Sequence, residues 1–284
     1  MKIKLYLSFV KFSHTLFAMP FAVVGFCMAI GLFGYQFEIL KLTYVILCMV
    51  FARNSAMAFN RWTDRKWDEA NTRTANREIP AGTIKPANAV LFVVINSIAF
   101  VATTFFINKI CFYLSPVALG IVLGYSYTKR FTFLSHFILG IGLGLAPIGA
   151  FLAVSGEFKM LPILLSFAVW AWVSGFDILY SIQDLEFDRA NNLFSVPAAF
   201  GIKSAILISR SMHLISALLI VSTAAFIPKS YLYISAVSLF CSLLIYQHSL
   251  VGSNKLDRIN FAFFNLNGFA SLLFSVLAVL AFCL

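Results

Sequence analysis

The chain has 284 residues, of which 61% are hydrophobic and 11% are charged, and its 21 Lys and Arg outnumber its 11 Asp and Glu. This apolar fraction is larger than a soluble domain of this length can bury, so the composition excludes an ordinary soluble protein. The net charge of +10 requires no nucleic-acid partner, because a basic protein face beside anionic lipid accounts for it.

Nine apolar stretches follow one another, each long enough to cross a hydrocarbon core of about 30 Å as a helix. They cover residues 14–33, 40–59, 87–107, 110–127, 132–154, 161–182, 205–227, 230–250 and 259–283. The alternation typical of an outer-membrane barrel is absent from the sequence, and helices are the remaining way to satisfy the backbone in lipid. We therefore predict an all-α integral membrane protein with nine transmembrane helices in a single domain, residues 1–284.

Lys and Arg are concentrated at the N-terminus and after each even-numbered span, and cytoplasmic loops carry such an excess. We expect the N-terminus and these loops in the cytoplasm and the C-terminus outside. The first 17 residues have no cleavage site followed by a soluble protein, and we interpret them as a retained interfacial stretch. The five cysteines and four histidines show no metal or disulfide spacing and are interpreted as structural.

The stretch NRWTDRKWDEANTRTANREIPAG, residues 60–82, gathers charged residues at the cytoplasmic end of the second span. Asn60, Asp64 and Asp68 recur every four residues, so on a continuing helix they face one side. Arg53 lies two turns earlier, inside an apolar span, where a charge costs a few kcal/mol unless it is paired or hydrated. We expect Arg53 to face the same cavity as the acidic residues.

A second acidic stretch, GFDILYSIQDLEFDRANN at residues 175–192, ends the sixth span. Asp184 and Asp188 are four residues apart, and Asp177 and Tyr180 lie on nearly the same face one and two turns earlier. Both even-numbered spans run in the same direction, so both clusters are predicted on one membrane face. Carboxylates beside many basic side chains suit Mg²⁺ and substrate phosphates. A charged loop alone is most often a solvated topology signal, but two clusters at matched depth favour a functional site.

These two stretches resemble the Asp-rich signatures of the UbiA superfamily of intramembrane prenyltransferases, in particular its 4-hydroxybenzoate polyprenyltransferase branch. GYSYTKRFT at residues 124–132 and KFSHTLFAMPFA at residues 11–22 are similar to the same branch, and the likeness covers about residues 11–201. The family's first signature is usually written with Asp after the Asn, whereas Arg61 follows Asn60 here. The extra acidic contact of that position is missing, while the main ligand positions are present.

The resemblance implies Mg²⁺-dependent transfer of a polyprenyl chain from polyprenyl diphosphate to an aromatic acid, with 4-hydroxybenzoate favoured, in quinone biosynthesis at a bacterial cytoplasmic membrane. The implied catalytic residues are Asp64, Asp68, Asp177, Asp184 and Asp188, and the implied metal ligands are Asn60, Asp64, Asp68, Asp184 and Asp188. The expected diphosphate-binding residues are Arg65, Arg73, Arg77, Lys129 and Arg130, and the expected acceptor-binding residues are Arg53 and Tyr180. The Phe-rich spans are expected to form a lipid-open tunnel for the prenyl tail.

Several alternatives stay open on the sequence. The ring proton of the acceptor goes either to Asp177 or to the leaving diphosphate. Sister branches prenylate haem, chlorophyll precursors or a dihydroxynaphthoate of menaquinone biosynthesis, and one sequence does not separate the two acids. A secondary transporter is the remaining alternative, but it would place its acidic groups near the bilayer midplane on broken helices.

Overall fold

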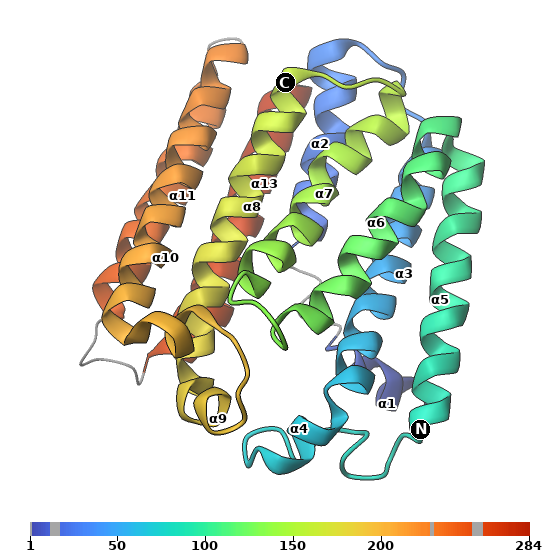
Figure 1. Cartoon of the computed structure of the whole chain (residues 1–284). Coiled ribbons are helices and arrows are strands. Elements are labelled where there is room, and N and C mark those ends of the chain that lie inside the picture. Colours follow the sequence, from blue (N-terminus) through green and yellow to red (C-terminus); the bar gives the residue numbers. More distant parts are fainter. Residues whose placement is uncertain (1, 12–17, 228–229, 252–257) are drawn as a thin grey trace.

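The computed structural model describes residues 2–11, 18–227, 230–251 and 258–284, and within these ranges every regular element is helical (Figure 1). Eight helices of this described part are long and apolar enough to cross a membrane, and α2, with 15 residues, is a shorter apolar helix. These helices correspond to the nine predicted spans. The start of the first predicted span, at residues 14–17, lies outside the described ranges. The predicted all-α membrane class is confirmed.

The helices are of two kinds, long ones that form the bundle and short ones between or beside them. The long ones are α2 (Met19–Phe33), α3 (Ile39–Thr63), α5 (Pro86–Ile107), α6 (Lys109–Thr128), α7 (Ser135–Ser155), α8 (Met160–Ser181), α10 (Val196–Thr223), α11 (Tyr231–Leu250) and α13 (Asn267–Cys283). The short ones are α1 (Lys2–Phe9), α4 (Arg65–Ala70), α9 (Leu185–Ala190) and α12 (Ile259–Phe261). Three further single turns are η2 (Ile182–Asp184), η3 (Ala224–Phe226) and the π-helical turn η4 (Ala262–Leu266).

Helix α10 begins nine residues before the predicted start of its span at residue 205. Ser195 caps it by accepting a hydrogen bond from the Ala198 backbone N–H at 3.3 Å. Gly201 then adopts φ 79° and ψ 169°, which interrupts the helical backbone after the first turn. The first residues of α10, VPAAFG, therefore form a separate turn that the predicted span does not include.

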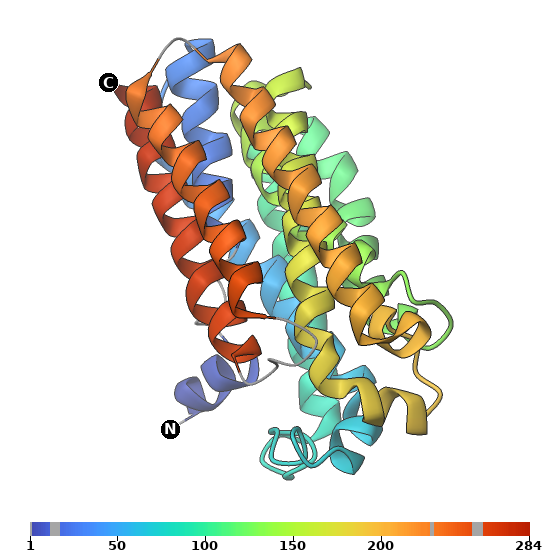
Figure 2. The ribbon, with the colours of Figure 1, turned by 90° about the vertical axis from the view of Figure 1, so that its left-hand side faces the viewer.

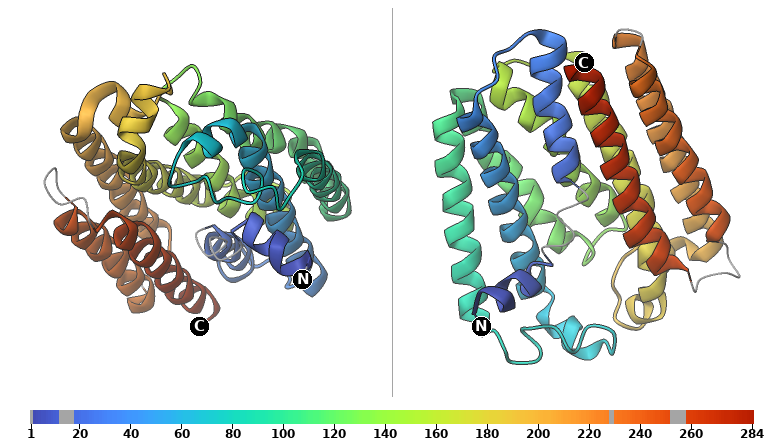
Figure 3. Two further views of the ribbon diagram at one scale, coloured as in Figure 1. Left: turned by 90° about the horizontal axis from the view of Figure 1, so that it is seen from below. Right: turned by 180° about the vertical axis from the view of Figure 1, so that it is seen from behind.

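The long helices lie side by side, and the two acidic segments are found at one end of the bundle (Figures 1 and 2). Helices α1, α4 and α9 lie at this end, and the C-terminus lies at the other. Seen from that end, α4 and the segment that follows it cross the bundle's face (Figure 3, left). The chain thus brings the two acidic stretches to the same end, as the direction of the even-numbered spans predicts.

The apolar core is centred on Trp172 of α8, which is fully buried. Its ring lies 5.4 Å from that of Phe21 and 5.8 Å from that of Phe240, centroid to centroid. Large apolar side chains such as Leu218 of α10 and Ile98 of α5 are exposed instead on the outer surface. Exposed apolar surface of this extent belongs in contact with lipid.

Helix α8, whose end bears the second acidic cluster, is fixed by hydrogen bonds as well as by apolar packing. Three α10 side chains hydrogen-bond backbone carbonyls of α8: Ser209 to Gly175 at 2.7 Å, His213 to Trp172 at 3.1 Å and Ser216 to Ala168 at 2.8 Å. On the opposite side, a Cβ at Gly140 of α7 would lie 2.3 Å from Ser174 Oγ, so the two backbones approach closely. The register of α8 against its neighbours is therefore closely specified.

Candidate active site

The first acidic cluster is a corner between two helices. Helix α3 ends at Thr63, Asp64 leaves helical geometry with φ −90° and ψ 1°, and α4 follows. Backbone hydrogen bonds nevertheless continue through the corner, from Asp64 to the Asn60 carbonyl at 2.9 Å and from Asp68 to the Asp64 carbonyl at 2.8 Å. The predicted continuous helix is therefore interrupted at Asp64.

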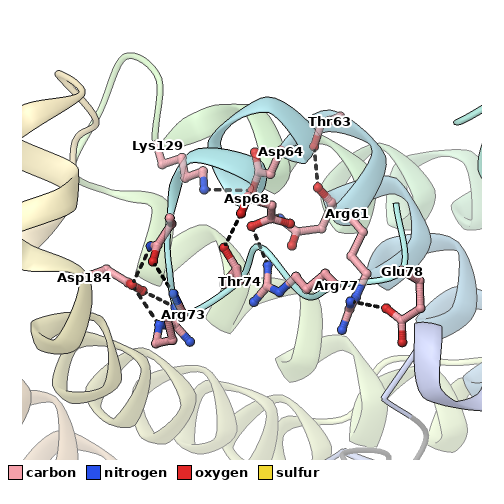
Figure 4. A network of polar contacts seen from close by, with 12 residues as sticks. Arg61, Thr63, Asp64, Asp68, Arg73, Thr74, Arg77, Glu78, Lys129 and Asp184 are labelled. Carbon is pink, nitrogen blue, oxygen red and sulfur yellow. Dashed lines mark hydrogen bonds and ion pairs between the residues drawn. The ribbon is translucent and has the colours of Figure 1, made fainter. Parts of the chain in front are cut away.

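The carboxylates of this corner are buried and paired with basic side chains (Figure 4). Lys129 Nζ lies 2.8 Å from Asp64 Oδ2, to which the Asn60 amide also donates at 3.1 Å. Arg77 donates to Asp68 Oδ1 at 2.7 Å. Burial raises the pKa of Asp64, and the nearby Lys129 ammonium opposes that shift. The charged form of Asp64 is thus held in a place that disfavours it.

The second acidic cluster is built in the same way. After α8 and the turn η2, Asp184 adopts φ −100° and ψ 6°, and α9 follows with Asp188 in it. Arg73, from the segment after α4, donates to Asp184 through Nε at 3.0 Å and through Nη2 at 2.5 Å. Asn71 adds a contact of 3.3 Å. A bidentate ion pair therefore joins the two clusters, which are more than a hundred residues apart in the chain.

Both clusters line one polar cavity of about 650 Å³. Of the predicted site residues, it is lined by Asn60, Asp64, Asp68, Arg73, Arg77, Lys129, Asp177, Tyr180, Asp184 and Asp188. Arg61, which stands where the family signature has Asp, also lines it and is paired with Glu78 at 2.6 Å. Ser8 of α1 donates to the same Glu78 at 2.7 Å, so this ion pair connects α1 with the segment after α4.

Arg65 and Arg130, two of the predicted diphosphate-binding residues, do not line this cavity. Arg65 donates to the Trp62 carbonyl at 2.7 Å and covers that residue's ring. Arg130 lies between the rings of Trp67 and Tyr127, 4.6 Å from each centroid. Its Nη2 donates to the Thr63 carbonyl at 2.9 Å and lies 3.6 Å from Asp64 Oδ1. This structure therefore gives both residues a role in holding the α3–α4 corner.

A second cavity, of about 410 Å³ and almost wholly apolar, lies between α3, α5, α6 and α7. Its lining includes Val117 and Phe158, which are exposed on the outer surface, so it opens towards the lipid side. Met57, Tyr125 and Leu139 line both cavities and form the junction between them. Phe100 and Phe158 are the only Phe residues among its described lining, and smaller aliphatic residues form most of it.

Arg53 lines the apolar cavity rather than the polar one. Seven helical residues separate it from Asn60, a rise of about 10 Å, which carries it past the junction. Its Nη2 donates to the Lys11 carbonyl at 3.3 Å, while its Nε is buried with no hydrogen-bond partner. None of the ion pairs found in the described ranges includes Arg53. Among the described residues, this guanidinium at the edge of an apolar cavity is thus left without a counter-ion.

Tyr180, the other predicted acceptor-binding residue, lines the polar cavity, whereas Arg53 lines the apolar one. Its hydroxyl accepts a hydrogen bond from Arg73 Nη1 at 3.2 Å, and the Arg73 guanidinium covers its ring at 5.6 Å. It therefore orients the side chain that joins the two clusters.

The sequence reasoning missed two residues of this site. Tyr125, inside the GYSYTKRFT stretch, lies at the junction, within electrostatic range of Arg53, Asp64 and Asp177. His136 hydrogen-bonds Asp177, with 2.7 Å between Nδ1 and Oδ2. Two other histidines, His213 and His248, also lie together, with 2.8 Å between their ring nitrogens. Residues 41 apart in sequence give no pattern that would have shown the contact between His136 and Asp177.

The donor set of the polar cavity fits a hard cation. Asp64 Oδ1 and Asp68 Oδ2 are both buried without a hydrogen-bond partner, and such oxygens favour a positive charge. No three Asp, Glu, His or Cys side chains of the described ranges converge into a complete metal site. Mg²⁺ needs no such cage, because it commonly takes one or two carboxylates together with substrate phosphates.

Comparison with known proteins places this geometry in a family. The model of the UbiA prenyltransferase family matches residues 18–280. A 4-hydroxybenzoate octaprenyltransferase of Photobacterium profundum is 28% identical over 239 residues, which are 84% of this chain and 83% of that protein. The corresponding protein of Tolumonas auensis is 28% identical over 224 residues, 78% of each chain.

Two solved structures show the same fold. The apo structure of a UbiA homolog from Aeropyrum pernix K1 has a TM-score of 0.83 and 30% identity, over 94% of this chain and 97% of the other. A UbiA homolog from Archaeoglobus fulgidus bound to GPP and Mg²⁺ has a TM-score of 0.79 and 19% identity, over 99% of this chain and all of the other. The second likeness concerns the fold alone.

Proposed function

The chain belongs to the UbiA prenyltransferase family, and from this premise we propose that it transfers a polyprenyl chain from a polyprenyl diphosphate to an aromatic hydroxy acid. The observation that carries the proposal is the junction of the two cavities at Met57, Tyr125 and Leu139. A polar cavity with two acidic corners adjoins an apolar one that opens to lipid, so one amphipathic substrate fits across both. The match to the prenyltransferase family over most of the chain argues against the alternative function of a secondary transporter.

The polar cavity suits the diphosphate of the donor. Lys129, Arg73 and Arg77 line it, and each is paired with a carboxylate there. These cations would exchange a carboxylate for a phosphate oxygen when the donor binds, and so stabilise the charge that develops as the allylic C–O bond breaks. Arg65 and Arg130 would contribute indirectly, by holding the corner.

We assign Mg²⁺ to the same cavity, with Asn60, Asp64, Asp68, Asp184 and Asp188 as its candidate ligands. The buried oxygens of Asp64 and Asp68 that have no hydrogen bond support this assignment most directly. A bound Mg²⁺ would supply positive charge to the diphosphate as it leaves. The homolog of Archaeoglobus fulgidus bound to GPP and Mg²⁺ has the same fold.

The apolar cavity suits the prenyl tail. Its opening beside Val117 and Phe158 would let a long chain extend into the bilayer without passing through water. The same apolar wall excludes water from the allylic carbon, which protects the carbocation from hydrolysis.

The acceptor is proposed to be an aromatic acid whose carboxylate binds Arg53. The guanidinium has no counter-ion in the described part of the chain and still has a free Nε–H. A carboxylate would satisfy both needs through charge-assisted hydrogen bonds. 4-Hydroxybenzoate is the first candidate, because the relatives of Photobacterium and Tolumonas carry its name. A dihydroxynaphthoate has the same combination of carboxylate and electron-rich ring and is the competitor to measure.

An acceptor comparison tests this function. Purified protein in lipid nanodiscs receives one polyprenyl diphosphate, Mg²⁺ and, in turn, 4-hydroxybenzoate, a dihydroxynaphthoate and a phenol without a carboxylate. We expect an acid to be prenylated, and Arg53→Ala to raise the KM of that acid about 30-fold, the equivalent of about 2 kcal/mol for a lost charge-assisted contact. Arg53→Lys is the matched control that keeps the charge. Equal turnover of the phenol, or a change confined to the donor KM, would move Arg53 to the donor site.

The orientation in the membrane is likewise proposed. The excess of Lys and Arg at the end that bears α4 and α9 favours the cytoplasm for this end. Single cysteines introduced at Glu69 and Glu186 into a cysteine-free background should then react with an impermeant maleimide only from the cytoplasmic side. A cysteine at Tyr231, at the other end, should react only from outside. Labelling of Glu69 and Glu186 from opposite sides would exclude a shared site.

A further inference from the structure

Asp177 differs from the ion-paired carboxylates of the polar cavity in its partner. It hydrogen-bonds His136 of α7, whereas Asp64, Asp68 and Asp184 are each paired with Lys or Arg. The side chain of His136 is 5% exposed, and that of Asp177, at 22%, is open to the cavity. The pair therefore has a buried half and a half that a substrate can reach.

The hydrogen bonds around His136 fix its tautomer. The Val196 backbone N–H points at Nε2 over 3.3 Å, and because an N–H can only donate, Nε2 must be the acceptor. The Ser181 hydroxyl, 3.5 Å from Nε2, donates to the Ile178 carbonyl at 2.8 Å. The proton of the neutral ring is therefore on Nδ1, from which it is donated to Asp177 Oδ2.

This arrangement leaves the second carboxylate oxygen of Asp177 free. No hydrogen bond to Oδ1 is found in the described ranges, and the residue lines the polar cavity. Tyr125, at the junction, lies within electrostatic range of both Asp177 and Arg53. An acceptor ring bound through its carboxylate at Arg53 would thus extend across the junction towards Oδ1 of Asp177.

We propose that Asp177 is the base that removes the ring proton of the acceptor, and that His136 is the positioning residue that aims its Oδ1 at the junction. The inference rests on the proposed function and deepens it. The allylic C–O bond breaks and its electron pair leaves with the diphosphate. The acceptor ring carbon then forms a C–C bond to the allylic carbon, and the proton on that ring carbon passes to Asp177 Oδ1, which restores aromaticity.

The charges in the cavity favour Asp177 over the leaving diphosphate in this role. Arg73, Arg77 and Lys129 lie on the diphosphate side, and phosphate oxygens held by these cations are weak bases. In the described ranges Asp177 is paired with none of these cations, and it lies within electrostatic range of Tyr125, one of the junction residues. The two steps of the reaction would therefore use different carboxylates. Those paired with Lys or Arg would act when the donor ionises, and Asp177 would act when the acceptor ring is deprotonated.

The test separates donor ionisation from proton removal in one Asp177→Asn variant. Ionisation is followed by exchange of ¹⁸O from the bridging to the non-bridging positions of the diphosphate, and we expect it to persist. Product formation should fall by about 10²–10⁴-fold, the usual contribution of a general base. With an acceptor deuterated at the prenylated ring position, a primary isotope effect on kcat should appear in the variant and be absent or small in the wild type. Product formation within threefold of wild type, or no isotope effect, would overturn the proposal.

Two substitutions of His136 separate aiming from mere packing. His136→Asn keeps an N–H donor near the position of Nδ1, whereas His136→Leu removes it. We expect the Asn variant to retain most of kcat. The Leu variant should lose most of kcat with unchanged KM values, and it should show the same isotope effect that we expect for Asp177→Asn. Equal losses in both folded variants without an isotope effect would reduce His136 to a packing residue and overturn its part of the proposal. If the wild type exchanges the donor oxygen but prenylates no aromatic acid, the proposed function itself fails, and this inference fails with it.

Discussion

The two acidic corners share a backbone design but differ in electrostatic state. Each follows a long helix, places an Asp at a break with φ −90° or −100° and continues into a six-residue helix. Their sequences, DRKWDEAN at residues 64–71 and DLEFDRAN at residues 184–191, match at both Asp, at an aromatic residue and at the closing Ala-Asn. The same local sequence pattern therefore forms both corners.

Their surroundings separate them. The Asp64 side chain is 4% exposed and keeps one buried oxygen without a hydrogen bond, and Asp68 does the same. The Asp184 side chain is 20% exposed, and Arg73, supplied by the segment after the first corner, engages both of its oxygens. Both corners therefore have basic partners, but the first keeps buried carboxylate oxygens without a hydrogen bond, whereas a ligand at the second must share or displace Arg73. Equal local structure does not imply equal readiness to bind a metal.

The largest expected effect comes from removing one carboxylate of either corner. Asp64→Asn and Asp184→Asn should each lower kcat by on the order of 10²–10³-fold or more, because each removes charge stabilisation of the departing diphosphate. The measurement is transfer of a labelled prenyl chain in nanodiscs, with inserted protein quantified in parallel. Retained turnover in either variant, or full activity in excess EDTA, would contradict the assignment of one composite metal site.

A smaller effect should distinguish basic residues inside the cavity from those outside it. Arg73→Ala and Arg77→Ala should raise the KM of the donor roughly tenfold, since each loses a charge-assisted contact of about 1.5 kcal/mol or more. Arg65→Ala, outside the cavity against Trp62, should change it by no more than about twofold, about 0.5 kcal/mol. The measurement is the KM of the donor in each variant, from steady-state kinetics at varied donor concentration. Equal effects of all three would show that Arg65 reaches the diphosphate in the bound state.

The smallest effect concerns stability and has opposite signs in the two corners. Burial raises the folded-state pKa of Asp64, so the stability this group contributes at low pH is lost as the pH rises through that pKa. Without metal at neutral pH, Asp64→Asn should therefore unfold at a higher temperature than the wild type, and the gap should close as the pH falls through the raised pKa.

Asp184→Asn is the matched comparison for that measurement. It loses a half-exposed ion pair with Arg73 and should be destabilised by about 1 kcal/mol or less. Mg²⁺ with a diphosphate should stabilise the wild type and not Asp64→Asn. A lower unfolding temperature for metal-free Asp64→Asn would contradict the conclusion that burial disfavours the charged form of Asp64.

The amino-acid sequence by itself determined the membrane class, the order of the spans and the two acidic corners at one end. Hydropathy over about 20 residues and a spacing of four residues along a helix are local properties. The direction in which each span crosses the membrane follows from its odd or even place in the order of spans. The tertiary structure alone decided where the side chains at these positions point. Arg130 is held between Trp67 and Tyr127, and Arg53 lies beyond the junction of the cavities, because neighbouring helices rather than local spacing set those directions. The contact between His136 and Asp177 depends on the register of α7 against α8, which close packing fixes at positions such as Gly140 and which no local pattern encodes.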